Sequence, residues 1–163
     1  MSFYENKGYH FERLPNKLIN IVLDTSVKEK TYKLIEPLVI DKHSDIFIDS
    51  FITFHTNGAS TGYTTSATNA VFIMGIKDLN MQGVSNGSDS TYYNKIVIPN
   101  TYGARDNVND KVTVHKSNKF NFVSSINPTT LSSLTISLTN NDNGIIGASG
   151  SKAWLVLYVV ARD

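Results

Sequence analysis

The chain alternates between short apolar runs and stretches rich in Gly, Asn, Ser and Thr, and most of the runs have a period of two. Such alternation is typical of β-strands with one buried face. The clearest example is SLTISLT, where we expect Leu134, Ile136 and Leu138 to face inward and the intervening Ser and Thr residues to face solvent. The pattern predicts about eight strands, over residues 18–24, 30–35, 46–55, 69–76, 94–98, 120–124, 134–139 and 153–161.

The segment 37–55, PLVIDKHSDIFIDSFITFH, departs from this pattern because its alternation leaves apolar residues on both faces. One predicted face carries Ile46, Ile48, Ile52 and Phe54, and the other carries Phe47, Asp49, Phe51 and Thr53. We expect the first face to contact the core. A free sheet face does not ordinarily present two large rings to water, so we expect Phe47 and Phe51 to be covered by another surface.

Other segments predict how the strands are arranged and connected. Residues 153–161 are apolar on both faces, which predicts a central strand or one covered on both sides. Asn-Gly pairs at positions 57, 86 and 143 predict chain reversals. Asn127 followed by Pro128 provides an N-cap type residue and a first-turn proline, which predicts a single helical turn.

Length and element pattern together predict one all-β domain. The 163 residues are enough to bury a self-sufficient core, and the short strands with polar connections favour an antiparallel sandwich or barrel. We place this domain at residues 18–163 and an N-terminal arm at residues 1–17. Two interpretations of the arm are open, an edge strand of its own sandwich or a segment that docks on a neighbour. Its aromatic residues are Phe3, Tyr4, Tyr9 and Phe11.

Charge and composition exclude several classes of partner. The formal net charge is +1 with both signs interspersed, so we expect no direct nucleic-acid binding. The absence of cysteine excludes disulfides, thiolate metal sites and a cysteine nucleophile. The longest apolar run, residues 153–161, is about half the length of a membrane-spanning helix, and the N-terminal residues lack the apolar core of a signal peptide.

No recognisable motif predicts a catalytic, cofactor or metal site, and we expect no enzymatic activity. The four histidines, at positions 10, 43, 55 and 115, lie on separate segments without metal-ligand spacing. NNDNG at 140–144 lacks the glutamate that a calcium loop requires at position 151, and GASG at 147–150 lacks the spacing of a nucleophile elbow. A cupin-type enzyme would need histidines and carboxylates clustered by folding.

Four segments carry a resemblance to a known family: PLVIDKHSDIFIDSFITF (37–54), NAVFIMGIKDLNMQGVSN (69–86), NKIVIPN (94–100) and INPTTLSSLTISLTNNDNG (126–144). In their amino-acid pattern and strand order they resemble small jelly-roll virion proteins of nucleocytoplasmic large DNA viruses. The resemblance implies a single jelly-roll antiparallel β-sandwich of about eight strands. It also implies a penton or minor capsid protein in the virion, assembled in the infected host cell. Other capsid proteins are then the partners, and a penton is expected to be a homo-oligomer of five copies.

These expectations lead to an interface hypothesis and a rival. In the hypothesis, Phe47 and Phe51 are buried between subunits together with Phe3, Tyr4, Tyr9 and Phe11 of the arm. Alternatively, the arm of the same chain covers the two rings. The rival function is a receptor- or carbohydrate-binding jelly roll of the fibre-head or lectin-like kind. It would use the loop tyrosines Tyr63, Tyr92, Tyr93 and Tyr102.

Overall fold

The computed structural model describes residues 16–55, 71–79, 81, 94–100, 111–115, 121–147 and 149–162. Within these ranges the chain forms nine β-strands and no helix, which confirms the predicted all-β class. The strands are β1 (Asn16–Asp24), β2 (Glu29–Ile40), β3 (Ser44–His55), β4 (Val71–Ile76), β5 (Ile96–Pro99), β6 (Lys111–His115), β7 (Asn121–Ile126), β8 (Thr129–Asn140) and β9 (Lys152–Ala161).

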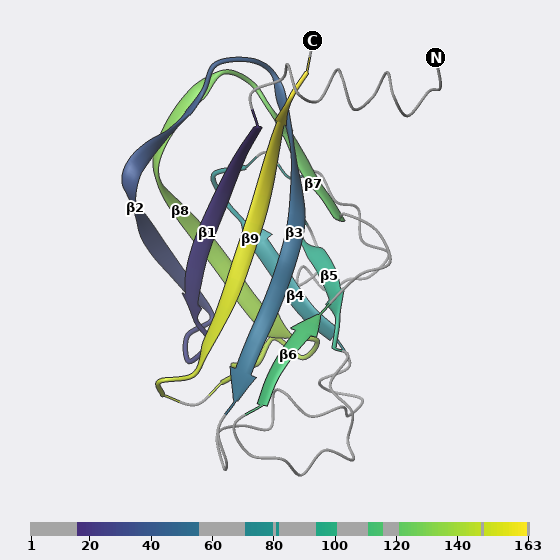
Figure 1. Cartoon of the computed structure of the whole chain (residues 1–163). Coiled ribbons are helices and arrows are strands. Elements are labelled where there is room, and N and C mark those ends of the chain that lie inside the picture. The colour runs from purple at the N-terminus through teal and green to yellow at the C-terminus, as the bar shows by residue number, and fades with distance from the viewer. Residues whose placement is uncertain are drawn as a thin grey trace.

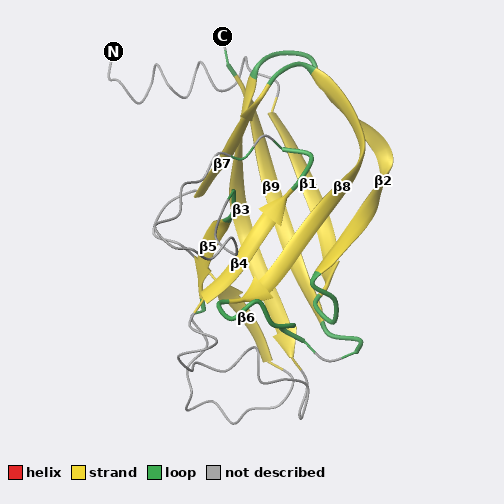
Figure 2. Cartoon of the chain, turned by 180° about the vertical axis from the view of Figure 1, so that it is seen from behind, coloured by secondary structure: helices red, strands yellow, loops and turns green. Residues whose placement is uncertain are grey.

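The strands form two antiparallel sheets that pack face to face as a sandwich (Figure 1). One sheet has the order β1-β9-β3-β6, with β7 also paired to β3, and the other has the order β2-β8-β4-β5. The pairs β1–β9, β2–β8, β3–β7 and β4–β5 make up one long antiparallel ribbon that is wound into two layers, as Figure 2 shows from behind. This strand order is that of a jelly roll.

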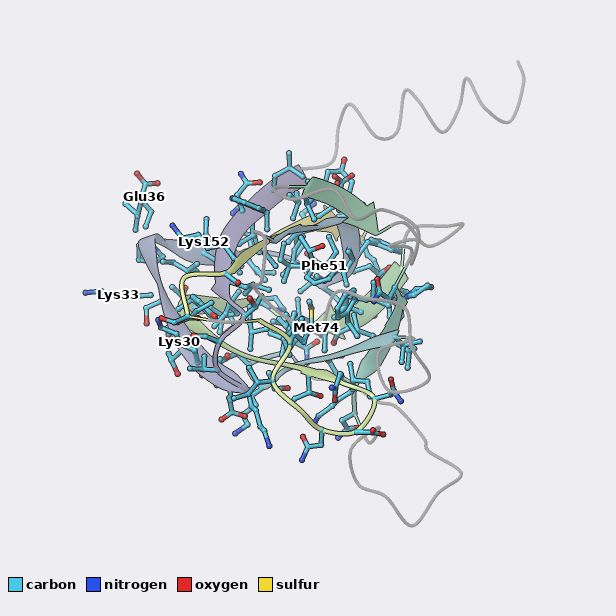
Figure 3. All side chains as sticks on the ribbon, turned by 90° about the horizontal axis from the view of Figure 1, so that it is seen from below. Lys30, Lys33, Glu36, Phe51, Met74 and Lys152 are labelled. Atoms are coloured by element: carbon cyan, nitrogen blue, oxygen red, sulfur yellow. The ribbon has the colours of Figure 1, made fainter. Side chains whose placement is uncertain are left out.

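The core lies between the two sheets and is built from alternate residues of nearly every strand. Phe51 of β3 and Phe72 of β4 meet across the layers in an edge-to-face pair, with ring centroids 5.4 Å apart. Neither residue is exposed to solvent. Figure 3, a view from below, places Phe51 and Met74 in the interior between the layers. Aromatic pairs in this geometry add about 0.5–1.5 kcal/mol to the gain from burial.

A β-bulge at Asp49 explains the two-faced pattern of β3 and corrects the prediction for Phe51. Ile48 pairs with Leu157 and Ser50 pairs with Val156, so Asp49 is an extra residue that has no partner on β9. Because side chains alternate across a strand, one extra residue reverses which positions face inward. Ile46 and Ile48 are buried before the bulge, as predicted, whereas Phe51 is buried after it.

The same reversal applies to the other residues after the bulge. Thr53 is buried, although the alternation placed it on the face away from the core. Ile52, predicted to face the core, is instead only partly buried. The side chain of Phe54 lies outside the described residues. On each side of the bulge, β3 therefore buries one face and turns the other away from the core. We predicted that Phe47 and Phe51 both face outward, and only Phe47 does.

The two strands with the clearest alternation behave mostly as predicted. Leu134, Ile136 and Leu138 are buried in β8. On its other face, however, Ser137 and Thr139 are also buried, so the expectation of a fully solvated face is wrong in this half of the strand. β8 is central between β2 and β4, and the side chain of Lys95 packs beside Gly75 next to Ser137. β9 lies between β1 and β3, which confirms its predicted central position.

Four further differences concern the bounds of the strands and their connections. Residues 37–40 belong to β2, and residues 41–43 separate them from β3. β6 was not predicted. Asn127 and Pro128 form a short bend between β7 and β8 instead of a helical turn, because Thr129 already pairs with Ile40 in the sheet. β1 begins at Asn16, so two residues assigned to the N-terminal arm belong to the sandwich.

Candidate interface surface

The outward face of the β1-β9-β3 sheet carries a row of apolar side chains that crosses four strands. Leu18 of β1 pairs with Tyr158 of β9, Tyr158 pairs with Phe47 of β3, and Phe47 pairs with Phe122 of β7. Residues directly opposite each other in antiparallel strands point to the same side of the sheet, so the four side chains form one line.

A second row runs parallel to the first, nearer the other end of the sandwich. Val22 of β1 pairs with Trp154 of β9, and Trp154 pairs with Ile52 of β3. We call the two rows together the outer patch, and it consists of Leu18, Val22, Phe47, Ile52, Phe122, Trp154 and Tyr158.

The outer patch is accessible to solvent in the isolated chain. Leu18, Val22 and Phe122 are 59%, 51% and 53% exposed, and the other four residues are partly buried. Phe47 and Phe122 form an edge-to-face pair with centroids 5.8 Å apart, so the two rings support each other on the surface. An apolar surface that carries aromatic rings is a common feature of protein-protein interfaces.

A charged network borders the patch where β3, β7 and the end of β9 meet. Arg162 donates from Nε to Asp45 Oδ2 at 2.8 Å, and its Nη2 lies 2.6 Å from Oδ1. Ser125 donates its hydroxyl to Asp45 Oδ1 at 2.6 Å. Burial alone would raise the pKa of Asp45, but the hydrogen bonds from Arg162 and Ser125 outweigh it and hold this pKa below its ordinary value.

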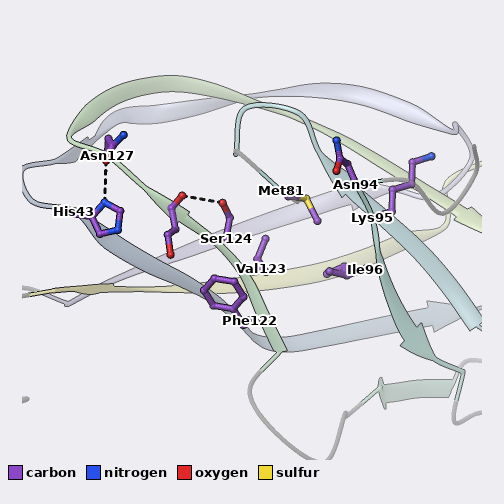
Figure 4. A pocket seen from close by; sticks show the side chains of 10 residues that line it. His43, Met81, Asn94, Lys95, Ile96, Phe122, Val123, Ser124 and Asn127 are labelled. Atoms are coloured by element: carbon purple, nitrogen blue, oxygen red, sulfur yellow. Dashed lines mark hydrogen bonds between the residues drawn. The ribbon is translucent and has the colours of Figure 1, made fainter. Parts of the chain in front are cut away.

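A polar pocket of about 370 Å³ lies beside Phe122, between β7 and the start of β5 (Figure 4). His43 Nδ1 is 2.9 Å from Asn127 Oδ1, and Ser124 donates its hydroxyl to the backbone oxygen of Ser125 at 3.1 Å. These side chains therefore bond to an amide and a carbonyl, and the described lining provides no serine-histidine pair of the kind that activates a nucleophile.

The predicted interface residues divide into three groups. Phe47 lies in the outer patch, as predicted. Phe51 lies in the core and is not an interface residue, because the bulge turns it inward. Phe3, Tyr4, Tyr9 and Phe11 of the arm lie outside the described residues, and so do the loop tyrosines Tyr63, Tyr92, Tyr93 and Tyr102.

Sequence reasoning missed most of the patch. It predicted that the last strand is apolar on both faces, but it did not predict that Leu18 and Phe122 join Tyr158 in one row. These residues come from strands more than a hundred positions apart in the sequence, and only the sheet order brings them together. Alternation in one strand provides no information about which other strand lies beside it.

Among the described residues, no group of three or more His, Cys, Asp or Glu side chains could hold a metal ion. The same part of the chain contains no helix with the length and apolarity needed to span a bilayer. In comparisons with known proteins, no protein family, curated protein or solved structure matches this chain.

Proposed function

We propose that this chain is a non-enzymatic structural protein of a large DNA virus capsid, as a penton or minor capsid component. The observation that carries the proposal is the outer patch, an aromatic and aliphatic surface on a jelly-roll sandwich. The resemblance of four sequence segments to small jelly-roll virion proteins adds the viral assignment. In this role the outer patch contacts neighbouring capsid subunits, and Phe47 and Phe122 are its central rings.

The proposal predicts that the outer patch drives assembly. As a penton, the chain assembles into a closed ring with a solution mass near five times its 18.1 kDa. Interface aromatics contribute about 1 kcal/mol or more each, so replacing Phe47 and Phe122 by Ser weakens each contact about 30-fold. Light scattering over a range of concentrations measures this shift toward monomer.

A matched double variant controls for the loss of apolar surface in general. Val97 of β5 is 46% exposed and Ile145, before β9, is 49% exposed, and neither belongs to the outer patch. Val97→Ser with Ile145→Ser leaves the oligomer unchanged. If the Phe47→Ser, Phe122→Ser variant forms the oligomer at the same concentrations as the wild type, the outer patch is not the interface. Absence of the chain from purified virions by mass spectrometry argues against the viral role.

A further inference from the structure

A second surface lies at the open side of the sandwich, where the edge strands of the two sheets face each other without pairing. Within the described residues β1 pairs with β9 alone, and β2 pairs with β8 alone. The space between β1 and β2 is a groove of about 710 Å³, lined by residues 17–22 and 32–39. Figure 1 shows β2 bowed away from β1 at this side.

The groove is closed at both ends and open in the middle. At one end, Lys17 of β1 donates its ammonium group to the backbone oxygen of Val39. At the other end, the Tyr32 hydroxyl accepts from the backbone N–H of Asp24 at 2.9 Å, and Lys30 pairs with Asp24 at 3.3 Å. Between these bridges the six residues 18–23 of β1 span about 20 Å. We call this opening the edge slot.

The walls of the edge slot are apolar, although they are open to solvent. Its inner side is formed by the core residues Ile19, Ile21 and Leu38. On the β2 side, pairing with β8 shifts register between Lys33 and Leu38, and the intervening segment bulges outward. Ile35 in this bulge is 103% exposed. Figure 3 shows Glu36 of the same segment far outside the rest of the molecule.

Of the two edges, β1 is the one suited to accept another strand. Its nine residues pair with β9 in an unbroken register, and it contains no proline and a single lysine. Long, regular edges of this kind are templates for strand addition. β2 is protected by its bulge, by Pro37 and by the exposed charges of Lys30, Lys33 and Glu36.

The segment best placed to fill the edge slot is the N-terminal arm, residues 1–15, which joins β1 at the rim of the slot. Fully extended, fifteen residues reach about 50 Å, more than twice the length of the slot. Alternation places Phe3, Tyr9 and Phe11 on one side of an extended arm, as an apolar slot requires.

The sequence at the junction favours insertion into a second copy over the arm's own slot. A residue before proline prefers an extended backbone, so the sequence Leu14-Pro15 favours an arm that continues the direction of β1 over one that reverses beside it. Folding back would require a tight reversal within residues 12–15, which include no Gly, Asn or Asp. We infer that the arm of one copy adds as a β-strand to β1 of a second copy, inside its edge slot. This inference does not depend on the viral assignment.

Disulfide trapping tests the pairing directly, because the chain contains no native cysteine. Full-length chains with a single cysteine on the outward side of the arm, at Asn6→Cys, His10→Cys or Glu12→Cys, are each mixed with a size-tagged chain carrying Asn20→Cys. Asn20 is exposed at the centre of β1. We expect at least one arm position to form the mixed disulfide under mild oxidation. A tagged Val97→Cys chain is the control and forms none.

Sedimentation velocity provides the second readout. Deleting residues 1–13 and replacing Ile35 by Lys each weaken self-association at least tenfold, whereas Ile145→Lys does not. Three results overturn the inference. One is a mixed disulfide that forms equally with Val97→Cys. The second is a disulfide that forms only within a chain carrying both the arm cysteine and Asn20→Cys, which places the arm in its own slot. The third is undiminished association of the truncated chain, which assigns the contact to another surface.

Discussion

At the scale of single residues, Phe47 and Phe51 show how one extra amino acid changes the role of a side chain. The two rings lie on the same strand, four positions apart, with Asp49 between them as the bulged residue. Phe47 faces outward and contacts Phe122, whereas Phe51 is fully buried against Phe72. One phenylalanine is therefore available for contacts with other molecules, and the other stabilises the fold.

This difference predicts opposite effects of the same substitution. Phe51→Ala leaves a cavity between the sheets, so we expect it to lower the free energy of unfolding by about 3–5 kcal/mol. Phe47→Ala removes one surface ring pair and lowers this free energy by about 1 kcal/mol. Urea denaturation followed by tryptophan fluorescence measures both. Equal losses for the two variants would contradict the core assignment of Phe51.

At the scale of elements, alternation in the sequence was sufficient to locate eight of the nine strands. It failed where the signal is short or interrupted. Residues 111–115, KVTVH, are a five-residue strand between polar stretches, and IFIDSFITF reads as one regular alternation although a bulge divides it. A bulge depends on the pairing of β3 with β9, which no local pattern encodes. The outer patch was predictable only as far as Phe47 for the same reason.

Connections between elements impose their own constraints, and Gly147 is the tightest. Its N–H donates to the Thr25 carbonyl at 2.9 Å, which joins the β8–β9 connection to the β1–β2 turn. A Cβ at this position would lie 2.2 Å from Thr25 Oγ1 and 2.8 Å from Ser151 Cβ. Thr25 and Ser151 are both buried, so neither side chain has free space to move into.

We therefore expect Gly147→Ala to destabilise the fold by about 2 kcal/mol through steric crowding. Ser149→Ala, at an exposed position in the same connection, leaves stability unchanged. Adding Thr25→Ala to Gly147→Ala removes the closest contact and recovers part of the loss. Thermal unfolding of the wild type and these three variants provides the comparison. An unchanged melting temperature for Gly147→Ala would show that the two connections are not tightly packed.

At the scale of the whole molecule, one ionic network connects three strand ends. Asp45 at the start of β3 binds Ser125 of β7 and Arg162, the residue after β9. Because these hydrogen bonds lower the pKa of Asp45 in the folded state, the carboxylate stabilises the fold at any pH above the ordinary aspartate value of about 3.9. This contribution is lost as the pH falls through the lowered pKa, when the carboxylate becomes protonated.

The predicted pH profile has a definite shape. The difference in unfolding free energy between wild type and Asp45→Asn is constant between about pH 5 and 8, and it shrinks below about pH 4. Arg162→Gln gives a profile with the same trend, because it removes the main hydrogen-bond donor of the carboxylate. Urea titrations at each pH provide the measurement. A difference that grows on acidification would show that the network does not stabilise the fold through the ionised carboxylate.

The pairing of β1 with β9 also determines when this protein can fold. β9 lies between β1 and β3, so β1 has no place in its sheet until β9 has been synthesised. Until then the side chains of Ile19, Ile21 and Leu23, which are buried in the folded protein, have no core to pack against. A nascent chain that stops before Lys152 leaves this strand unpaired, and an exposed apolar strand of this kind favours aggregation.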